Sequence, residues 1–180
     1  DGSLTSASSS VSVSFTPVND APTISAVSNQ TVNEDSTLGP IDFTISDSDS
    51  ASLTVSVSTS DGTLIPAGNI VLGGIGSNRT VTLTPAANLN GGPVTITLTV
   101  SDGSLTAQTS FDVTVLAVND APTIGSAAFT VPENAVNGTL VGTVVASDVD
   151  LGDTQSFSIT GGDPLNAFAI VALCRITVAD

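Results

Sequence analysis

The residues of this chain with the clearest chemical potential are acids placed one residue apart. Asp47-Ser48-Asp49 and Asp148-Val149-Asp150 each hold two carboxylates across a single residue. Calcium takes about six to eight oxygen ligands, mainly carboxylates, carbonyls and waters. Clustered carboxylates repel one another unless a cation lies among them, and the chain has only two bases, Arg79 and Arg175, for a net charge of −15. The acid pairs therefore predict cation binding.

The composition argues against several other functions. The chain contains no His and no Lys, so it lacks the commonest general base and cannot form a Schiff base. We therefore predict that it is not an enzyme. Seventeen acids against two bases also argue against nucleic-acid binding, and no apolar run approaches the roughly 20 residues that cross a bilayer. The single Cys174 excludes an intrachain disulfide and is predicted to be a small buried hydrophobe.

The heptapeptide VNDAPTI occurs twice, at Val18–Ile24 and Val118–Ile124. A repeat with an offset of 100 residues indicates tandem domains of that length. We expect residues 1–18 to be the last strand of a preceding repeat, 19–118 to be a complete β-sandwich, and 119–180 to be a partial sandwich without its last strands. On this interpretation the chain is a window from a longer array.

Alternating apolar and Ser/Thr residues predict short strands that are apolar on one face. About seven strands in about 100 residues is the size of an immunoglobulin-like domain, so the predicted fold class is all-β, with tandem immunoglobulin- or cadherin-like Greek-key β-sandwiches. The turn Ser101-Asp102-Gly103-Ser104 predicts a hairpin. The other expected strands contain Val11/Val13/Phe15, Ile41/Phe43/Ile45, Leu53/Val55/Val57, Ile70/Leu72, Val81/Leu83, Phe129/Val131, Leu140/Val144, Phe157/Ile159, Phe168/Ile170 and Ile176/Val178. Turns are expected at Leu38-Gly39-Pro40, Ser60-Asp61-Gly62, Gly73-Gly74 and Asn90-Gly91-Gly92.

Several spaced motifs after Ile124 resemble cadherin repeats over about 60 residues. They are Val131-Pro132-Glu133-Asn134-Ala135, Gly138-Thr139-Leu140-Val141-Gly142-Thr143-Val144, Asp148-Val149-Asp150, Phe157-Ser158-Ile159 and Phe168-Ala169-Ile170. The preceding unit is similar to the cadherin-like tandem repeats of large bacterial surface adhesins, with Asn33-Glu34-Asp35 and Asp47-Ser48-Asp49 at the places of the acidic motifs.

This resemblance implies calcium bound between consecutive domains. The ligands that it implies are Glu34, Asn119, Asp120, Asp148, Asp150 and Asp153 at one junction, and Asn19, Asp20, Asp47 and Asp49 at the other. Glu133 would serve a later junction. The chain departs from the family pattern where Pro17 and Ala117 stand at a position that often holds Asp, and where Asn88 and Asn90 stand near an acidic cluster of the family. The alternative is that these Asp and Asn residues are solvated turn residues, which we expect of Asp61-Gly62 and Asp102-Gly103.

The favoured function is a structural and adhesive repeat segment of an exported, bacterial cell-surface protein. Its expected partners are adjacent repeats of the same polypeptide and identical chains, with no nucleic acid and no membrane insertion. One alternative is a filament subunit that donates the strand Val11–Phe15 to another copy. The other is a glycan-binding module, although the chain has no Trp or Tyr for sugar stacking and its six Phe lie mostly in strand patterns that predict burial.

Overall fold

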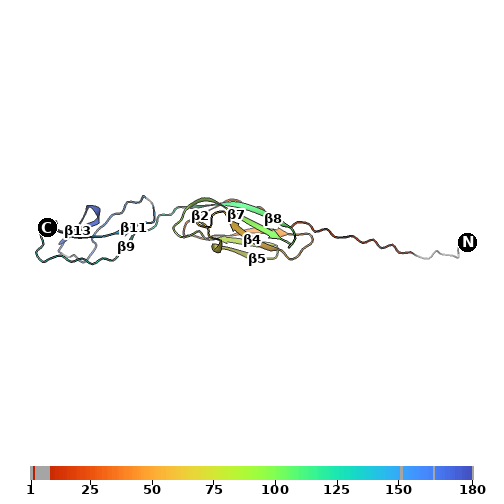
Figure 1. Ribbon diagram of the computed structural model, residues 1–180, viewed down its shortest axis with the longest axis horizontal. Helices are drawn as coiled ribbons and strands as arrows, with labels where there is room; N and C mark the ends of the chain where they lie inside the picture. The colour runs from red at the N-terminus through yellow and green to blue at the C-terminus, as the bar shows by residue number, and fades with distance from the viewer. Residues whose placement is uncertain (1, 3–8, 151, 164, 180) are drawn as a thin grey trace.

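The computed structural model describes residues 2, 9–150, 152–163 and 165–179. Within this part of the chain the regular structure is β-strands and two 3-10 turns, η1 (Ala67–Asn69) and η2 (Ala172–Cys174). The molecule is elongated: residues 9–17 extend from one end, a unit of strands β1 to β8 lies in the middle, and a unit of strands β9 to β13 lies at the other end (Figure 1). None of the described helical segments is long and apolar enough to cross a membrane.

The first unit is made of two four-stranded sheets, with strand orders β1-β3-β6-β5 and β2-β8-β7-β4. Its strands are β1 (Thr23–Ile24), β2 (Gln30–Asn33), β3 (Leu38–Ser46), β4 (Thr54–Thr59), β5 (Ile70–Ile75), β6 (Asn78–Leu83), β7 (Gly91–Ser101) and β8 (Thr106–Leu116). Neighbouring strands are antiparallel except β2 and β8, which run parallel. The predicted all-β fold class and the hairpin around Asp102-Gly103 are confirmed.

The core lies between the two sheets and comes from the predicted alternation. In β7 the side chains of Val94, Ile96, Leu98 and Val100 are at most 1% exposed, whereas the Thr residues between them face outward. Phe43 and Phe111 fill the same core. A strand with one apolar face buries that face against a second sheet and leaves its hydroxyl face to water.

Three of the expected turns are wrong, because their glycines lie inside strands. Gly39 lies at a register shift in the pairing of β3 with β6, and Gly92 lies at a register shift in the pairing of β7 with β8. Their φ angles are +110° and +111°. A side chain at either position would also press on the neighbouring strand: a Cβ on Gly39 would lie 2.8 Å from the carbonyl oxygen of Val81. These glycines serve β-bulges, and Gly73-Gly74 lies within β5.

The second unit contains β9 (Thr123–Ile124), β10 (Leu140–Thr143), β11 (Ala146–Ser147), β12 (Phe168–Val171) and β13 (Arg175–Val178). β9 pairs with β11 as β1 pairs with the end of β3, and β10-β13-β12 form a sheet. This arrangement repeats the β1-β3-β6-β5 sheet of the first unit.

The strands expected at Phe129/Val131, Phe157/Ile159 and Val11/Val13/Phe15 are not formed in the described structure. The physical reason is the lack of a pairing strand: β2 and β4 of the first unit pair with β8 and β7, and the described part of the second unit holds no counterpart of those two strands. An isolated extended segment has nothing to satisfy its backbone groups except water.

Two expectations about burial also need correction. Phe43 and Phe111 are buried, but Phe15 is 90% exposed and Phe129 is 39% exposed, because the strands that would cover them are not formed. Cys174 is only half-buried, since it lies in the tight turn η2, where its φ is +57°.

Truncating a buried aromatic ring should lower the free energy of unfolding much more than truncating an exposed one. Phe111→Ala should lower the free energy of unfolding of the first unit by about 3–5 kcal/mol, because it removes a fully packed aromatic side chain. The matched change Phe15→Ala should alter it by less than about 0.5 kcal/mol, because that ring is exposed. Urea denaturation of the dilute protein measures both, and equal losses would contradict this core.

Candidate metal centre

The centre is built around the linker that joins β8 to β9. On the side of the first unit, the backbone N–H of Val118 donates to Oε1 of Glu34 at 2.8 Å. The backbone N–H of Glu34 donates in turn to the carbonyl of Leu116 at 2.9 Å, which continues the parallel pairing of β2 with β8. Glu34 is only 3% exposed, and the side-chain amide of Asn90 also donates to its carboxylate at 3.3 Å. The carboxylate is therefore held in one orientation at the start of the linker.

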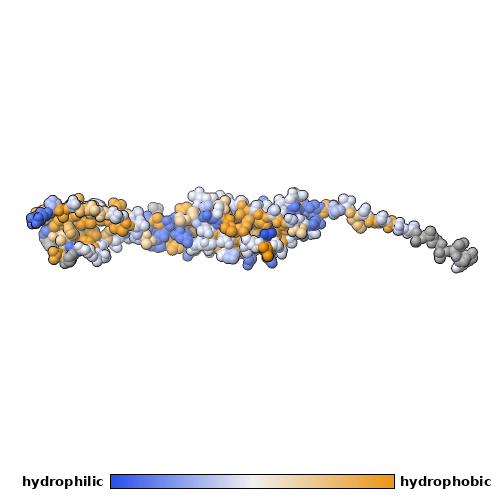
Figure 2. Space-filling model, turned by 90° about the horizontal axis from the view of Figure 1, so that it is seen from below, coloured by the Kyte–Doolittle hydropathy of each residue, from blue (hydrophilic) through white to orange (hydrophobic). Residues whose placement is uncertain are grey.

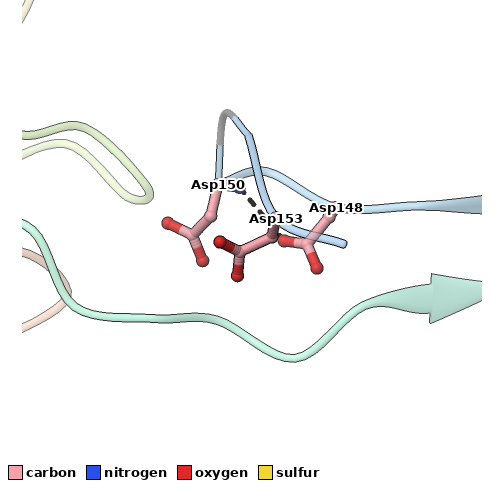
Figure 3. A group of neighbouring side chains, drawn as sticks. All are labelled: Asp148, Asp150 and Asp153. Atoms are coloured by element: carbon pink, nitrogen blue, oxygen red, sulfur yellow. Dashed lines mark hydrogen bonds between the residues drawn. The ribbon is translucent and has the colours of Figure 1, made fainter. Parts of the chain in front are cut away.

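On the side of the second unit, the loop after β11 supplies three acids. The carboxylates of Asp148, Asp150 and Asp153 lie within 4.8 Å of one another and point into a shared space beside the linker (Figure 3). The loop is shaped by the backbone N–H of Asp150, which donates to Oδ1 of Asp148 at 3.1 Å. The backbone N–H of Asp120 donates to Oδ2 of Asp150 at 2.5 Å and so ties the linker to this loop.

One oxygen at the joint has no partner. Oδ2 of Asp120 is buried and accepts no hydrogen bond from any described residue. An unpaired buried acceptor costs free energy unless something else satisfies it. A cation among these oxygens would do so.

The surroundings of Asp120 also oppose its ionisation. Burial raises the pKa of this carboxyl, and the negative charges of Asp35, Asp150, Glu34 and Asp148 raise it further. No positive group is among these causes. A divalent cation would reverse the effect, because it favours the charged form of its ligands.

A cleft of about 370 Å³ opens beside the cluster. It is lined by Asn90, Ala117, Val118, Asn119, Asp150 and Asp153. Residues of the first unit, the linker and the second unit thus border one space. The side-chain amide of Asn119 donates to the carbonyl of the next residue, Asp120, at 2.9 Å.

The other predicted junction repeats this geometry at the opposite end of the first unit. The backbone N–H of Asp20 donates to Oδ2 of Asp49 at 2.8 Å, and the backbone N–H of Asp49 donates to Oδ1 of Asp47 at 2.7 Å. Oδ2 of Asp47 is buried and unpaired among the described residues, as Oδ2 of Asp120 is. Among those residues, only the second junction brings three carboxylates within 4.8 Å.

Sequence reasoning assigned Asp102 to turn chemistry alone, and the structure adds a second contact. Its Oδ1 accepts from the backbone N–H groups of Ser104 and Leu105, at 2.6 and 2.7 Å, as a turn aspartate does. Its Oδ2 accepts from the side-chain amide of Asn19 at 2.8 Å, so the β7–β8 hairpin tip contacts the first linker. The Leu105 N–H, the Asn19 amide and the Ser104 N–H lower the pKa of Asp102. The Asp102-Gly103 pair predicted the turn, but it did not predict the contact with Asn19, which lies 83 residues earlier in the chain.

Asp35 is a second residue that sequence reasoning did not place at the joint. It follows Glu34 with φ of +57°, and its Oδ1 accepts from the backbone N–H of Asn88 at 3.0 Å. Asn88 and Asn90, which stand near the position of an acidic cluster in the family pattern, thus each hold one acid at this end of the unit. Glu133, expected to serve a later junction, is exposed.

The opposite pKa directions of Asp120 and Asp102 give a prediction for the metal-free protein. Asp120 has a raised pKa, so its contribution to stability is complete below the ordinary value of 3.8 and is lost as pH rises through the raised value. Asp102 has a lowered pKa, so its contribution is present above 3.8 and is lost as pH falls.

In chelator, the midpoint of thermal unfolding of Asp120→Asn relative to the wild type should therefore increase as pH rises from about 3 to about 7. The relative midpoint of Asp102→Asn should decrease over the same range. Differential scanning calorimetry of the three proteins measures these trends. Trends of the same sign would show that the two acids do not lie in the environments described.

The chain was compared with curated protein sequences and with solved structures. No curated protein sequence matches the chain significantly. Among solved structures, human CDH23 EC21-23 is 20% identical with a TM-score of 0.49, and the match covers 91% of this chain and 55% of that one. A chimeric titin Z1Z2 functionalised with a decorin peptide is 21% identical with a TM-score of 0.43, over 57% of this chain and all of that one. An endo-fucoidan hydrolase of glycoside hydrolase family 107 is 21% identical with a TM-score of 0.42, over 67% of this chain and 16% of that one.

A family model gives the assignment. The model described as "Bacterial Ig domain" matches residues 19–115, which is more than half of the chain and spans β1 to β8 nearly to its end. Immunoglobulin-like domains are generally non-enzymatic. This chain belongs to the bacterial Ig domain family.

Proposed function

We propose that this chain is a structural and adhesive repeat segment of an exported bacterial cell-surface protein, in which calcium stiffens the joints of a spacer. On this proposal residues 1–18 are the last strand of a preceding repeat, 19–118 are a complete domain, and 119–180 are part of the next domain. The observation that supports it best is the linker: the amides of Val118 and Asp120 are bound by carboxylates of different units, Glu34 and Asp150.

The donor set suits calcium. Every side chain proposed as a ligand at this joint offers oxygen, and hard oxygen donors favour calcium over softer metals. The ligands would be Glu34 from the first unit, Asn119 and Asp120 from the linker, and Asp148, Asp150 and Asp153 from the second unit. The buried, unpaired oxygen of Asp120 and the raised pKa of that carboxyl are what such a site should show before it is loaded.

A cation at this position would restrain the joint because its ligands come from both sides of the linker. The linker is already stiff, since Pro122 fixes its own φ and biases Ala121 toward extended backbone. The equivalent residues at the first joint would be Asn19, Asp20, Asp47 and Asp49, where the hydrogen bonds of Asp20 and Asp49 follow the same pattern.

A stack of such units would work as a spacer. In tandem arrays each unit contacts mainly its neighbours, so length and stiffness are set at the joints. The partners proposed for this chain are adjacent repeats of the same polypeptide. The proposed location is extracellular, at the cell surface.

Small-angle X-ray scattering with and without a calcium chelator tests the stiffened joint. Calcium should increase the maximum dimension of the wild type and narrow its distribution of conformations. Asp150→Asn and Glu34→Gln should lose this response and should weaken calcium binding by about 10- to 100-fold, because each removes a charge from the site. Calorimetric titration measures the affinity.

Asp42→Asn is the matched control. Asp42 is an exposed acid in the middle of β3, away from both joints, so its loss changes the net charge equally without touching the proposed site. It should keep the calcium response. A maximum dimension of the wild type that is the same in calcium and in chelator would contradict the proposal.

A further inference from the structure

Strand β5 of the first unit has one backbone edge without a partner strand. β4 and β5 end the two sheets and contact each other, so they lie on the same side of the sandwich, and neither has a second neighbour in the described part of the chain. β5 reads Ile-Val-Leu-Gly-Gly-Ile, with no charge and no proline, and no register shift interrupts its pairing with β6. Charges, prolines and bulges are what usually protect a free edge from other strands. The free edge of β5, which we call the β5 edge, is therefore open to pairing.

The hydrogen bonds beside β5 show which backbone groups face this edge. The N–H of Thr84 donates to the carbonyl of Asn69 at 3.1 Å, so these two residues form a hydrogen-bonded pair. Hydrogen-bonded and non-hydrogen-bonded pairs alternate along an antiparallel ladder. Counted from this pair, Leu72 and Gly74 direct their N–H and carbonyl groups away from β6 and toward the β5 edge.

Two apolar side chains of β5 lie in water beside this edge. Val71 is 61% exposed and Ile75 is 87% exposed, on the face opposite to Leu72, which packs against the core. A second β5 laid antiparallel, with its Ile75 opposite Val71, would cover both side chains at once. The same register places Leu72 opposite Gly74, so that the free N–H and carbonyl groups of the two edges meet. The β5 edge is thus complementary to itself.

The surface and the charge distribution also favour a second copy on this side. Figure 2 views the molecule from below Figure 1, where β5 is drawn, and shows hydrophobic residues gathered over the middle of the first unit. The strands of this unit carry two acids, Asp42 in β3 and Asp112 in β8, and each of these strands is separated from the β4 and β5 side by one strand. That is roughly 10 Å by strand spacing, or about one Debye length at physiological salt. On the opposite side, β1 and β2 lie directly beside the two acidic strands.

The two ends of the β5 edge carry opposite charges. At one end Arg79 stands opposite Gly74, and its side chain lines the groove between β4 and β5. At the other end lies Asp61, which is exposed: its Oδ1 accepts from the N–H of Leu64 at 3.2 Å, and the Leu64 carbonyl accepts from the N–H of Ala86, just beyond β6. Antiparallel pairing of two β5 strands brings the Arg79 end of each copy beside the Asp61 end of the other. Parallel pairing would bring like charges together.

We propose that two copies of this chain pair side by side through β5, antiparallel, with Val71 of each copy opposite Ile75 of the other. The β1-β3-β6-β5 sheets of the two copies then form one continuous sheet about a two-fold axis, so the contact closes as a dimer. β5 lies along the long side of the first unit (Figure 1). Neighbouring repeats, which meet this unit at its ends, therefore leave the β5 edge free. The pairing uses none of the proposed calcium ligands.

Disulfide trapping tests the pairing and its register. The native thiol is first removed by Cys174→Ser, and one preparation then carries Val71→Cys while another carries Ile75→Cys. Opposite residues of a non-hydrogen-bonded antiparallel pair lie about 4.5 Å apart at Cα, which is within disulfide range. On oxidation, the mixture should give at least about tenfold more cross-linked dimer than either preparation alone, because each position faces the other and not itself. Cross-linking of either preparation alone that equals that of the mixture would overturn the proposal.

Sedimentation velocity of the full chain over a concentration series, in chelator, gives the second readout. The wild type should form dimers as its concentration rises. Ile75→Lys should raise the dissociation constant of the dimer at least about tenfold, because it sets a charge against the apolar Val71 of the other copy. Ile75 is 87% exposed, so its replacement leaves the first unit folded.

Thr44→Lys is the matched control for this measurement. It adds the same charge at an exposed position of β3, two strands from the β5 edge, and should leave the dissociation constant unchanged. A wild type that is monomeric at every concentration, or equal effects of the two lysine substitutions, would overturn the proposal.

Discussion

Two backbone amides in a short linker organise the joint of this molecule. The N–H of Val118 binds Glu34 on one side, and the N–H of Asp120 binds Asp150 on the other. These bonds fix the carboxylates in place, and they also crowd negative charge around Asp120, whose pKa rises because of burial and the surrounding acids. The arrangement holds acids together without neutralising them, which is why a bound cation is the simplest completion of the joint.

The sandwich makes this arrangement possible because paired strands lie directly before the acids. Glu34 follows β2, whose pairing with β8 continues through the N–H of Glu34 to Leu116. The Asp148–Asp153 loop follows β11, which is tied to β9 just beyond the linker. The strands thus fix where Glu34 and this loop begin, and the loop places its three acids beside the linker. The bond from Asp120 to Asp150 recurs from Asp20 to Asp49, and the bond from Asp150 to Asp148 recurs from Asp49 to Asp47, so the repeat carries this side of the joint together with the domain.

Much of the first unit was predictable from its sequence, because apolar residues at every second position of a strand must lie on the same face. Val94, Ile96, Leu98 and Val100 had to share a face, and the structure buries all four. Glycine was ambiguous: Gly39 and Gly92 were expected in turns but serve bulges, since a positive φ suits both and only the partner strand decides between them. The strand at Phe129/Val131 was not formed because pairing depends on a neighbour, which local pattern does not report. The pairs of acids were visible in sequence, whereas the contacts of Asp35 and Asp102 join residues more than 50 positions apart and needed the fold.

A cation held by oxygens from both units and from the linker, as we propose, would be located by anomalous scattering in a crystal structure grown with calcium. We predict an anomalous peak between the two units, with oxygens of Glu34, Asp120 and at least one of Asp148 and Asp150 at about 2.3–2.6 Å from it. A well-ordered joint with no anomalous peak there, or an ion bound by residues of one unit alone, would contradict it.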